Sequence, residues 1–118
     1  MSLEYVTGAE FVLANDNVGI TVLNSGGLTV SARIIVFEST GGGAVALADS
    51  GVLAVAPGST VGLGVSLMAS GFYWITIHAQ SDELVPNVHF GRLQGGLPVT
   101  FASYSPGDFA VFQRTRSD

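Results

Sequence analysis

The sequence predicts an all-β protein, a single antiparallel β-sandwich that is immunoglobulin-like or jelly-roll-like and has about nine or ten short strands. Three observations predict it. Apolar residues alternate with polar or small residues along several short runs. Clusters of Gly, Pro, Asn, Asp and Ser separate these runs roughly every 6–12 residues. No stretch has the apolar period of a helix. A length of 118 residues fits one domain, residues 1–118.

Residues 52–79 carry the clearest pattern and predict a meander of three strands against which the other strands pack. The first turn contains Pro57 and Gly58, which suit the fixed and positive φ angles of a β-turn. The second turn ends at Gly71. It leads into residues 72–77, FYWITI, the densest aromatic and β-branched run of the chain and a strong strand signal.

The N-terminal half predicts a lead-in over residues 1–8, with a short edge strand at residues 3–7, followed by further strands. Asn- and Gly-containing turns separate these strands at residues 15–17 and 24–27. After a glycine loop at residues 39–43, Ser50-Gly51 predicts a turn between two short strands. The expected strands span residues 10–14, 18–24, 28–38, 44–49 and 52–55.

The C-terminal part predicts three more strands and a frayed, charged tail at residues 114–118. Pro86 lies near the start of the first of these strands, where a missing N–H does least harm. Gln94-Gly95-Gly96-Leu97 predicts a hairpin turn, and residues 105–108 predict another turn. The expected strands span residues 84–93, 98–104 and 109–113.

The composition excludes several functions. Charged residues make up 11% of the chain, against roughly 25% in an ordinary soluble domain. The net charge is −5 and there is no lysine, so no basic patch exists for nucleic acid. Cysteine is absent, which removes disulfides and thiolate chemistry. No apolar run is long enough to span a membrane, and the N-terminus lacks the pattern of a signal peptide.

Part of the chain resembles the bacterial immunoglobulin-like sandwich of the CARDB type, the cell-adhesion-related domain found in bacteria. The resemblance rests on Asn24-Ser25-Gly26, the alternating residues 32–37, the Pro57-Gly58 turn and the strand from Gly71 to Ile77. It covers about half of the chain, and its motifs are structural. It implies a sandwich fold and a non-enzymatic role in adhesion, spacing or assembly, and it assigns no functional residue.

An outward-facing apolar surface is the main candidate for function. Alternation places Tyr73, Ile75 and Ile77 towards the core, so Phe72, Trp74 and His78 face outwards. Aromatic side chains on an outer face are typical of protein interfaces, and they also suit stacking on a sugar. A third interpretation is that the terminal strands cover them. The expected interface residues are Ile35, Phe37, Phe72, Trp74, His78, Phe109 and Phe112.

The sequence predicts no catalytic, cofactor-binding or metal-binding residue. His78 and His89 could lie on adjacent strands of one hairpin, but their spacing matches no metal motif. Asn15-Asp16-Asn17 follows no calcium-loop pattern and is explained as a turn. Residues 41–46 contain the glycines of a dinucleotide loop without the helix that such a loop requires. Neither a Gly-x-Ser-x-Gly motif nor a lysine for Schiff-base chemistry is present.

We therefore expect a structural protein rather than an enzyme: a self-associating subunit of a filament, coat or virion decoration at an extracellular or particle surface. A low charge suits dense packing, because unpaired charges at an interface are costly. The expected partners are further copies of the chain, without nucleic acid or membrane insertion. The alternative is an adhesion module that binds a glycan or a surface protein through Trp74.

Overall fold

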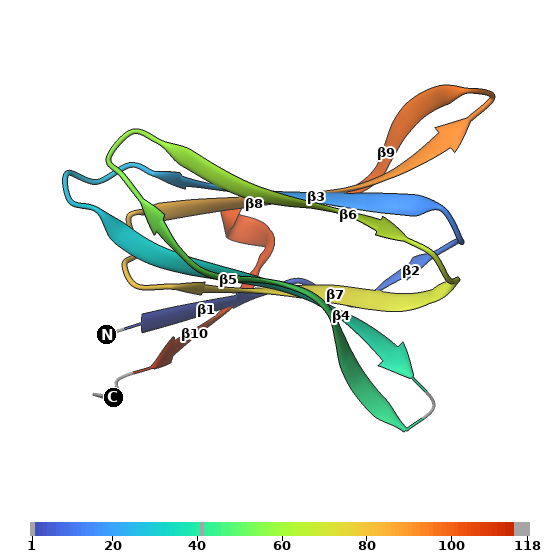
Figure 1. Ribbon diagram of the computed structural model, residues 1–118, viewed down its shortest axis with the longest axis horizontal. Coiled ribbons are helices and arrows are strands. Elements are labelled where there is room, and N and C mark those ends of the chain that lie inside the picture. The colour runs from blue at the N-terminus through green and yellow to red at the C-terminus, as the bar shows by residue number, and fades with distance from the viewer. Residues whose placement is uncertain (1, 41, 115–118) are drawn as a thin grey trace.

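The computed structural model describes residues 2–40 and 42–114 and consists of two antiparallel β-sheets packed face to face (Figure 1). This confirms the predicted all-β sandwich. A single 3-10 turn, η1 (Pro106–Asp108), interrupts the strands. The strands are β1 (Ser2–Val6), β2 (Glu10–Val12), β3 (Asp16–Asn24), β4 (Val30–Thr40), β5 (Gly43–Val55), β6 (Thr60–Leu67), β7 (Gly71–Ala79), β8 (Leu84–Gln94), β9 (Leu97–Tyr104) and β10 (Ala110–Arg114).

The order of the strands is that of a jelly roll. Sheet A has the order β10-β1-β7-β4-β5, and β2 also pairs with β7. Sheet B has the order β6-β3-β8-β9. The ladders β4–β5, β3–β6 and β2–β7 are nested within one another along the chain. Such nesting arises when a long hairpin is folded over into two sheets.

The predicted meander over residues 52–79 is wrong, because β5, β6 and β7 alternate between the two sheets. The Pro57-Gly58 turn itself forms as expected: Gly58 has φ 73° and the Ser59 N–H donates to the Ala56 carbonyl at 3.0 Å. However, the Gly58 N–H also donates to the Asn24 carbonyl at 2.9 Å. This bond ties the turn to the end of β3, so the chain continues in sheet B.

The two strands expected at residues 44–49 and 52–55 are one strand, β5. Arg33 is opposite Val52 and Ile35 is opposite Asp49, so Ser50 and Gly51 together face one residue of β4. Gly51 has φ 68°, and the Ser50 hydroxyl accepts a hydrogen bond from the Ile34 N–H at 2.9 Å. The predicted turn is therefore a β-bulge that leaves the strand continuous.

The expected lead-in contains an internal strand. β1 pairs with β10 on one side and with β7 on the other, and Tyr5 is buried. The prediction of an edge strand is wrong because the last strand of the chain returns to cover that edge. The predicted tail begins at Arg114, the last residue of β10, and residues 115–118 lie outside the described residues.

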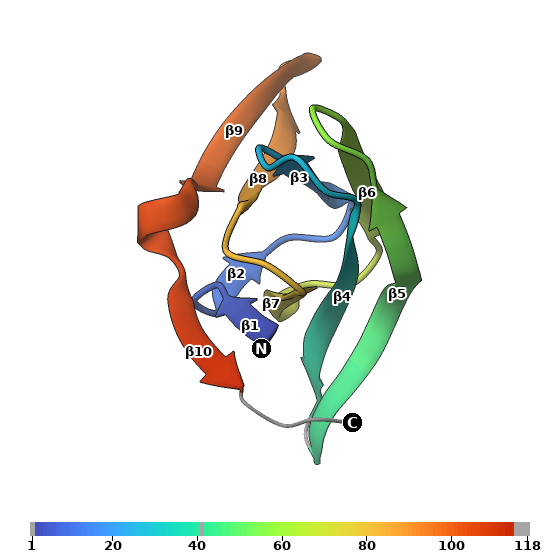
Figure 2. The ribbon, with the colours of Figure 1, turned by 90° about the vertical axis from the view of Figure 1, so that its left-hand side faces the viewer.

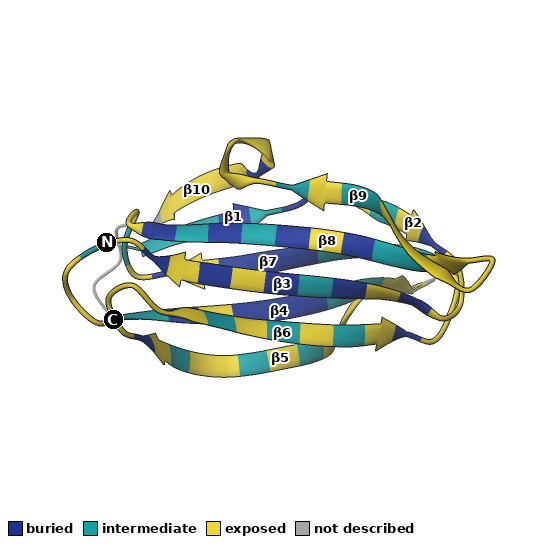
Figure 3. Cartoon of the chain, turned by 90° about the horizontal axis from the view of Figure 1, so that it is seen from above, coloured by how far each residue is buried: buried dark blue, intermediate teal, exposed yellow. Residues whose placement is uncertain are grey.

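The core lies between the sheets and consists of the inward side chains of both. Burial alternates along β3 and is seen as dark and light bands in Figure 3. The largest fully buried side chains are Tyr73, Phe90, Ile20, Ile34, Leu67, Ile75, Ile77 and Leu84. The described residues include no helix long and apolar enough to cross a membrane.

Asn24 is buried at the end of β3 and supports the predicted turn there. Its Nδ2 donates to the carbonyls of Leu28 at 2.7 Å and Val55 at 2.8 Å. Its Oδ1 accepts from the Gly26 N–H at 2.9 Å. A buried amide is tolerated only when such bonds satisfy it, so this residue joins β3 to the end of β5 in the other sheet.

Candidate interaction surface

β7 places aromatic side chains on the outer face of sheet A, as the alternation predicted. Tyr73, Ile75, Ile77 and Ala79 are buried in the core. Phe72, Trp74, Thr76 and His78 lie on the opposite face of the same strand. Strand geometry causes this division, since successive side chains point to opposite faces of a sheet.

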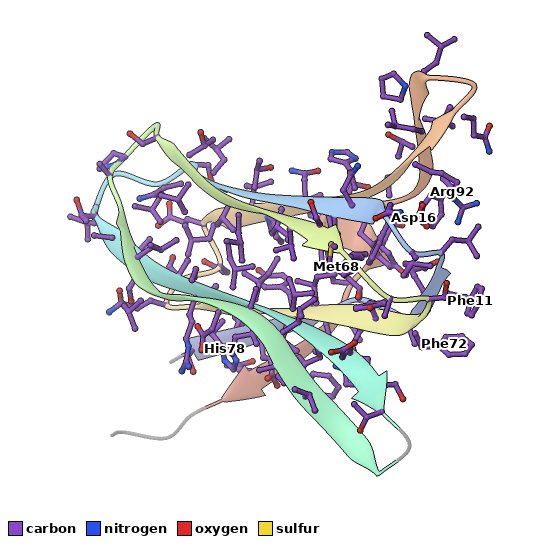
Figure 4. The ribbon with its side chains drawn as sticks, turned by 45° about the vertical axis from the view of Figure 1, so that its right-hand side comes forward. Phe11, Asp16, Met68, Phe72, His78 and Arg92 are labelled. Carbon is purple, nitrogen blue, oxygen red and sulfur yellow. The ribbon has the colours of Figure 1, made fainter. Side chains whose placement is uncertain are left out.

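Four aromatic side chains form a patch on this face. Trp74 is opposite Phe37 of β4, and their rings stack with centroids 5.6 Å apart and planes at 15°. Phe72 is opposite Phe11 of β2, and these rings meet edge to face at 5.4 Å. We call Phe11, Phe37, Phe72 and Trp74 the aromatic patch. Figure 4 shows Phe11 and Phe72 projecting together at one end of the sandwich.

The patch is unevenly exposed. Phe11 and Phe72 are 53% and 51% exposed, whereas Phe37 and Trp74 are half-buried. Apolar rings exposed to this extent remain costly in water, and a covering surface would remove that cost.

Ile35 and Thr76 lie opposite each other on the outer face next to the patch, yet they are only 8% and 7% exposed. The hydroxyl of Thr76 is buried without a hydrogen-bond partner in the described part of the protein. An unsatisfied buried hydroxyl costs about 1–3 kcal/mol. The outer face of sheet A is therefore packed and partly dehydrated even in the single chain.

The other end of this face is polar. His78 Nε2 lies 3.6 Å from Glu4 Oε2, and Arg33 is opposite His78 on β4. Arg33 also binds Asp49, with Nε donating to Oδ1 at 3.0 Å. This hydrogen bond, with a second from the Gly51 N–H, lowers the pKa of Asp49 to about 2. A pocket of about 530 Å³ opens beside Arg33 and His78, with Ser31, Val52 and Gln80 also on its walls.

The terminal strands leave this face uncovered, so the interpretation in which they cover the aromatic side chains is wrong. β10 continues sheet A beside β1, and β9 continues sheet B beside β8. Figure 2 shows β10 and the β4–β5 hairpin at the two sides of β1 and β7. The strands extend the sheets sideways because their edges offer unpaired backbone groups.

The two expected interface residues of the last strand have different positions. Phe112 is 49% exposed on β10, opposite Glu4, and extends the outer face of sheet A. The prediction that Phe109 is an interface residue is wrong. It precedes β10, is buried in the core and packs against Tyr5 and Tyr104, with ring centroids 5.8 and 5.7 Å away. The 3-10 turn before it directs its ring between the sheets.

The structure assembles no metal site from the histidines. His78 is on β7 in sheet A and His89 is on β8 in sheet B, so the idea of one hairpin is wrong. Both are exposed, on different sheets. Asp16 accepts bonds from Arg92 and from the Leu13 N–H, which explains it as a structural residue. The described residues contain no cluster of three or more metal-ligating side chains.

Sequence reasoning missed Phe11 and Val52. Residues 10–14 were expected to be a core strand, but only Val12 of this segment is fully buried. Strand alternation places Phe11 and Val12 on opposite faces, so the sequence did indicate that one of the two faces outwards. Val52 is exposed because the bulge at Gly51 changes the alternation of β5, and that effect depends on pairing with β4.

Comparisons with known proteins bear on the fold alone. No family model matches the chain, and no curated protein matches its sequence. A crystal structure of Thermotoga maritima 1070 is similar, with a TM-score of 0.59 and 11% sequence identity over 91% of this chain and 96% of that one. At this identity the similarity shows a shared fold.

Proposed function

We propose that this protein is a non-enzymatic structural subunit that self-associates through the outer face of sheet A, as part of a surface or particle assembly such as a filament, coat or virion decoration. The observation that carries the proposal is the aromatic patch on a sheet face that no described strand covers. Aromatic anchors surrounded by dehydrated side chains are the usual centre of protein interfaces.

The surroundings of the patch favour a protein partner. Ile35 and Thr76 are already dehydrated, so a covering surface need displace little water from them. Phe72 and Phe11 offer rings whose burial would contribute roughly 25 cal/mol per Å² of apolar area.

The test is the molar mass in solution, measured by light scattering on a sizing column, with electron microscopy of the same sample. Wild-type protein should form regular assemblies, and Trp74→Asp should break them down into soluble, folded species no larger than a dimer of the 12.1 kDa chain. Leu28→Asp is the matched control, because Leu28 is highly exposed in the loop after β3, away from the patch. Loss of solubility in Trp74→Asp, or dissociation in the control alone, would contradict the proposal.

The alternative function is an adhesion module that binds a glycan or a surface protein. A sugar site needs an aromatic platform beside polar groups. Trp74 lies four residues from His78 along β7, or about 13 Å, so a single sugar could not contact both the ring and the pocket beside His78. Titration of Trp fluorescence with sugars separates the two functions: the assembly model predicts no response, whereas the module predicts saturation.

A further inference from the structure

β6, the end strand of sheet B, has an unpaired edge without the features that usually protect such edges. It pairs with β3 in one continuous register from Thr60 to Leu67, and no described strand pairs with its other side. Its sequence, TVGLGVSL, contains no charged residue and no proline. An edge of this kind is a template for another strand.

The other edges of the sandwich are protected. The β4–β5 ladder has two register shifts, and Gly51 of β5 takes a positive φ. β9 contains Pro98, and its ladder with β8 has a register shift. β10 is only five residues long. Short strands, prolines and bulges all discourage pairing with another chain, so β6 differs from the other edges.

Two of the four β6 residues that direct backbone groups outwards are glycines. The Asn24 N–H donates to the Ser59 carbonyl at 3.0 Å, which makes Leu23 and Thr60 a non-hydrogen-bonded pair of the ladder. By alternation, the residues that direct N–H and C=O away from β3 are Thr60, Gly62, Gly64 and Ser66.

Gly64 has no local reason to be glycine. Its φ is not positive, and a Cβ atom there would meet nothing within 4 Å. A glycine inside a strand weakens it, and one reason for a glycine at such a position is the close approach of another backbone. Gly64 leaves the centre of β6 without a side chain on the outer face of sheet B, next to its outward N–H and C=O groups.

The inner face of β6 is incomplete as well. Val61, Leu63 and Val65 point into the sandwich but are only half-buried, as is Leu53 of β5. They lie along the side where the two sheets end at β5 and β6 (Figure 3). A strand added beside β6 would place its own side chains next to these and complete their burial.

We propose that β6 pairs antiparallel with β6 of a second copy, so that two copies of sheet B form one continuous sheet about a two-fold axis. Free backbone donors and acceptors require an extended strand as the partner, and a two-fold axis lets each copy supply the same one. In the register with Gly62 opposite Gly64 of the second copy, Leu63 lies beside its symmetry mate. No charge on β6 opposes this contact.

This pairing goes beyond the proposed function, because it uses none of the outer face of sheet A. Two separate contacts would let an assembly grow, whereas either contact alone can close into a pair if it is two-fold symmetric. The two contacts can therefore be removed independently and tested separately.

The test uses Trp74→Asp protein, in which the sheet A contact is removed, and measures molar mass by light scattering over a range of concentrations. This protein should run as a dimer. Adding Gly64→Pro should give monomers of 12.1 kDa, because proline removes an outward N–H that β3 does not use. Adding Gly64→Lys should weaken the dimer several-fold, because the two lysines would lie at diagonal positions on one face of the paired strands and repel each other.

Gly19→Lys is the matched control. Gly19 is the register partner of Gly64 on β3, and a side chain there also meets nothing within 4 Å. It should leave the dimer intact, since β3 is an internal strand. Circular dichroism and thermal melting verify folding of each variant. If Gly64→Pro unfolds, Gly64→Lys decides the result.

Amide hydrogen exchange gives a second readout. The outward amides of Thr60, Gly62, Gly64 and Ser66 should become more protected as concentration rises, because the other β6 amides are already bonded to β3. If Trp74→Asp protein is monomeric and these four amides exchange freely, the proposed function stands and the pairing is overturned. A dimer that survives both Gly64 substitutions would also overturn it. If the assembly persists in Trp74→Asp protein but dissociates in Gly64→Lys protein, the pairing is supported and the proposed function is refuted.

Discussion

Asp16 and Arg92 form a two-pronged ion pair, with Nε–Oδ1 at 2.9 Å and Nη2–Oδ2 at 2.8 Å. Asp16 begins β3, and Arg92 lies on β8, where its guanidinium is 4.5 Å from the centroid of the Phe101 ring on β9. The Leu13 N–H donates to the same carboxylate at 2.8 Å. The pair therefore holds the turn before β3 to the β8–β9 hairpin, and Figure 4 shows the two side chains close together.

Asp16→Ala should lower the free energy of unfolding by about 3 kcal/mol, because it leaves the Arg92 guanidinium without the buried carboxylate that it binds. The Asp16 side chain is only 3% exposed. Urea unfolding followed by circular dichroism measures the loss. Asp49→Ala is the control: it removes a similar pair with Arg33 that is far more exposed, so its effect should be much smaller. Equal losses in the two variants would contradict this account.

Stability should fall in acid. The hydrogen bond from Arg92 holds the pKa of Asp16 below its ordinary value, and the Arg33 guanidinium lowers the pKa of Asp49 to about 2. Both carboxylates titrate near about 3.9 in the unfolded chain. Because the folded-state pKa values of both carboxylates are lower than the unfolded-state value, their ionised forms stabilise the fold above about pH 3.9. This stabilisation is lost as the pH falls through the folded-state pKa values.

Urea unfolding at a series of pH values from about 7 to about 2 measures this acid dependence. The free energy of unfolding should begin to fall near pH 4, and Asp16→Asn should flatten the fall. An unchanged profile in Asp16→Asn would assign the acid sensitivity to other carboxylates.

Stability should also fall in strong alkali. Tyr104 donates a short hydrogen bond to Glu10, and burial together with this carboxylate raises the pKa of Tyr104 to about 12. Its unfolded-state value is about 10. Because the folded-state pKa is raised, the stabilisation is complete below pH 10 and is lost between about pH 10 and 12. Burial also raises the pKa values of Tyr5 and Tyr73. Ultraviolet titration of tyrosinate should therefore lose one of three late groups in Tyr104→Phe, the one that titrates near pH 12, and an unchanged titration would refute the assignment.

Replacing Gly58 and Gly19 by alanine should change the stability of the fold in opposite directions. Gly58 has φ 73° in the turn before β6, so Gly58→Ala should destabilise the fold by about 1–2 kcal/mol. Gly19 has neither a positive φ nor a neighbour within 4 Å of a Cβ atom. Gly19→Ala should therefore stabilise it by about 0.5–1 kcal/mol. Thermal melting compares the two variants, and a destabilising Gly19→Ala would indicate an unseen constraint on the outer face of sheet B.

Local pattern was enough to predict the strands and the faces of β7. Tyr73 and Trp74 fall on opposite faces because strand geometry alone decides it. The Pro57-Gly58 turn was predicted for the same reason, since its φ angles are set by those two residues.

The arrangement of the strands was not predictable, because it depends on pairing between distant segments. The alternation of residues 60–67 is the same whether the strand joins sheet A or sheet B. Pairing with β3 along its whole length places it in sheet B, and the bond from Gly58 to Asn24 anchors its start. Phe109 was assigned to the surface for the same reason: its burial depends on Tyr5, more than a hundred residues earlier in the chain.

The nested ladders set an order for folding. Of the three nested ladders, the β4–β5 hairpin closes the shortest loop, so it loses the least chain entropy and can form first. The β3–β6 and β2–β7 ladders then close successively longer loops around it. β1 gains its second neighbour only when β10 is present, so the first strand made on the ribosome is among the last to be fully paired. Synthesis proceeds from one end of the chain, whereas the nested ladders close outwards from the β4–β5 hairpin.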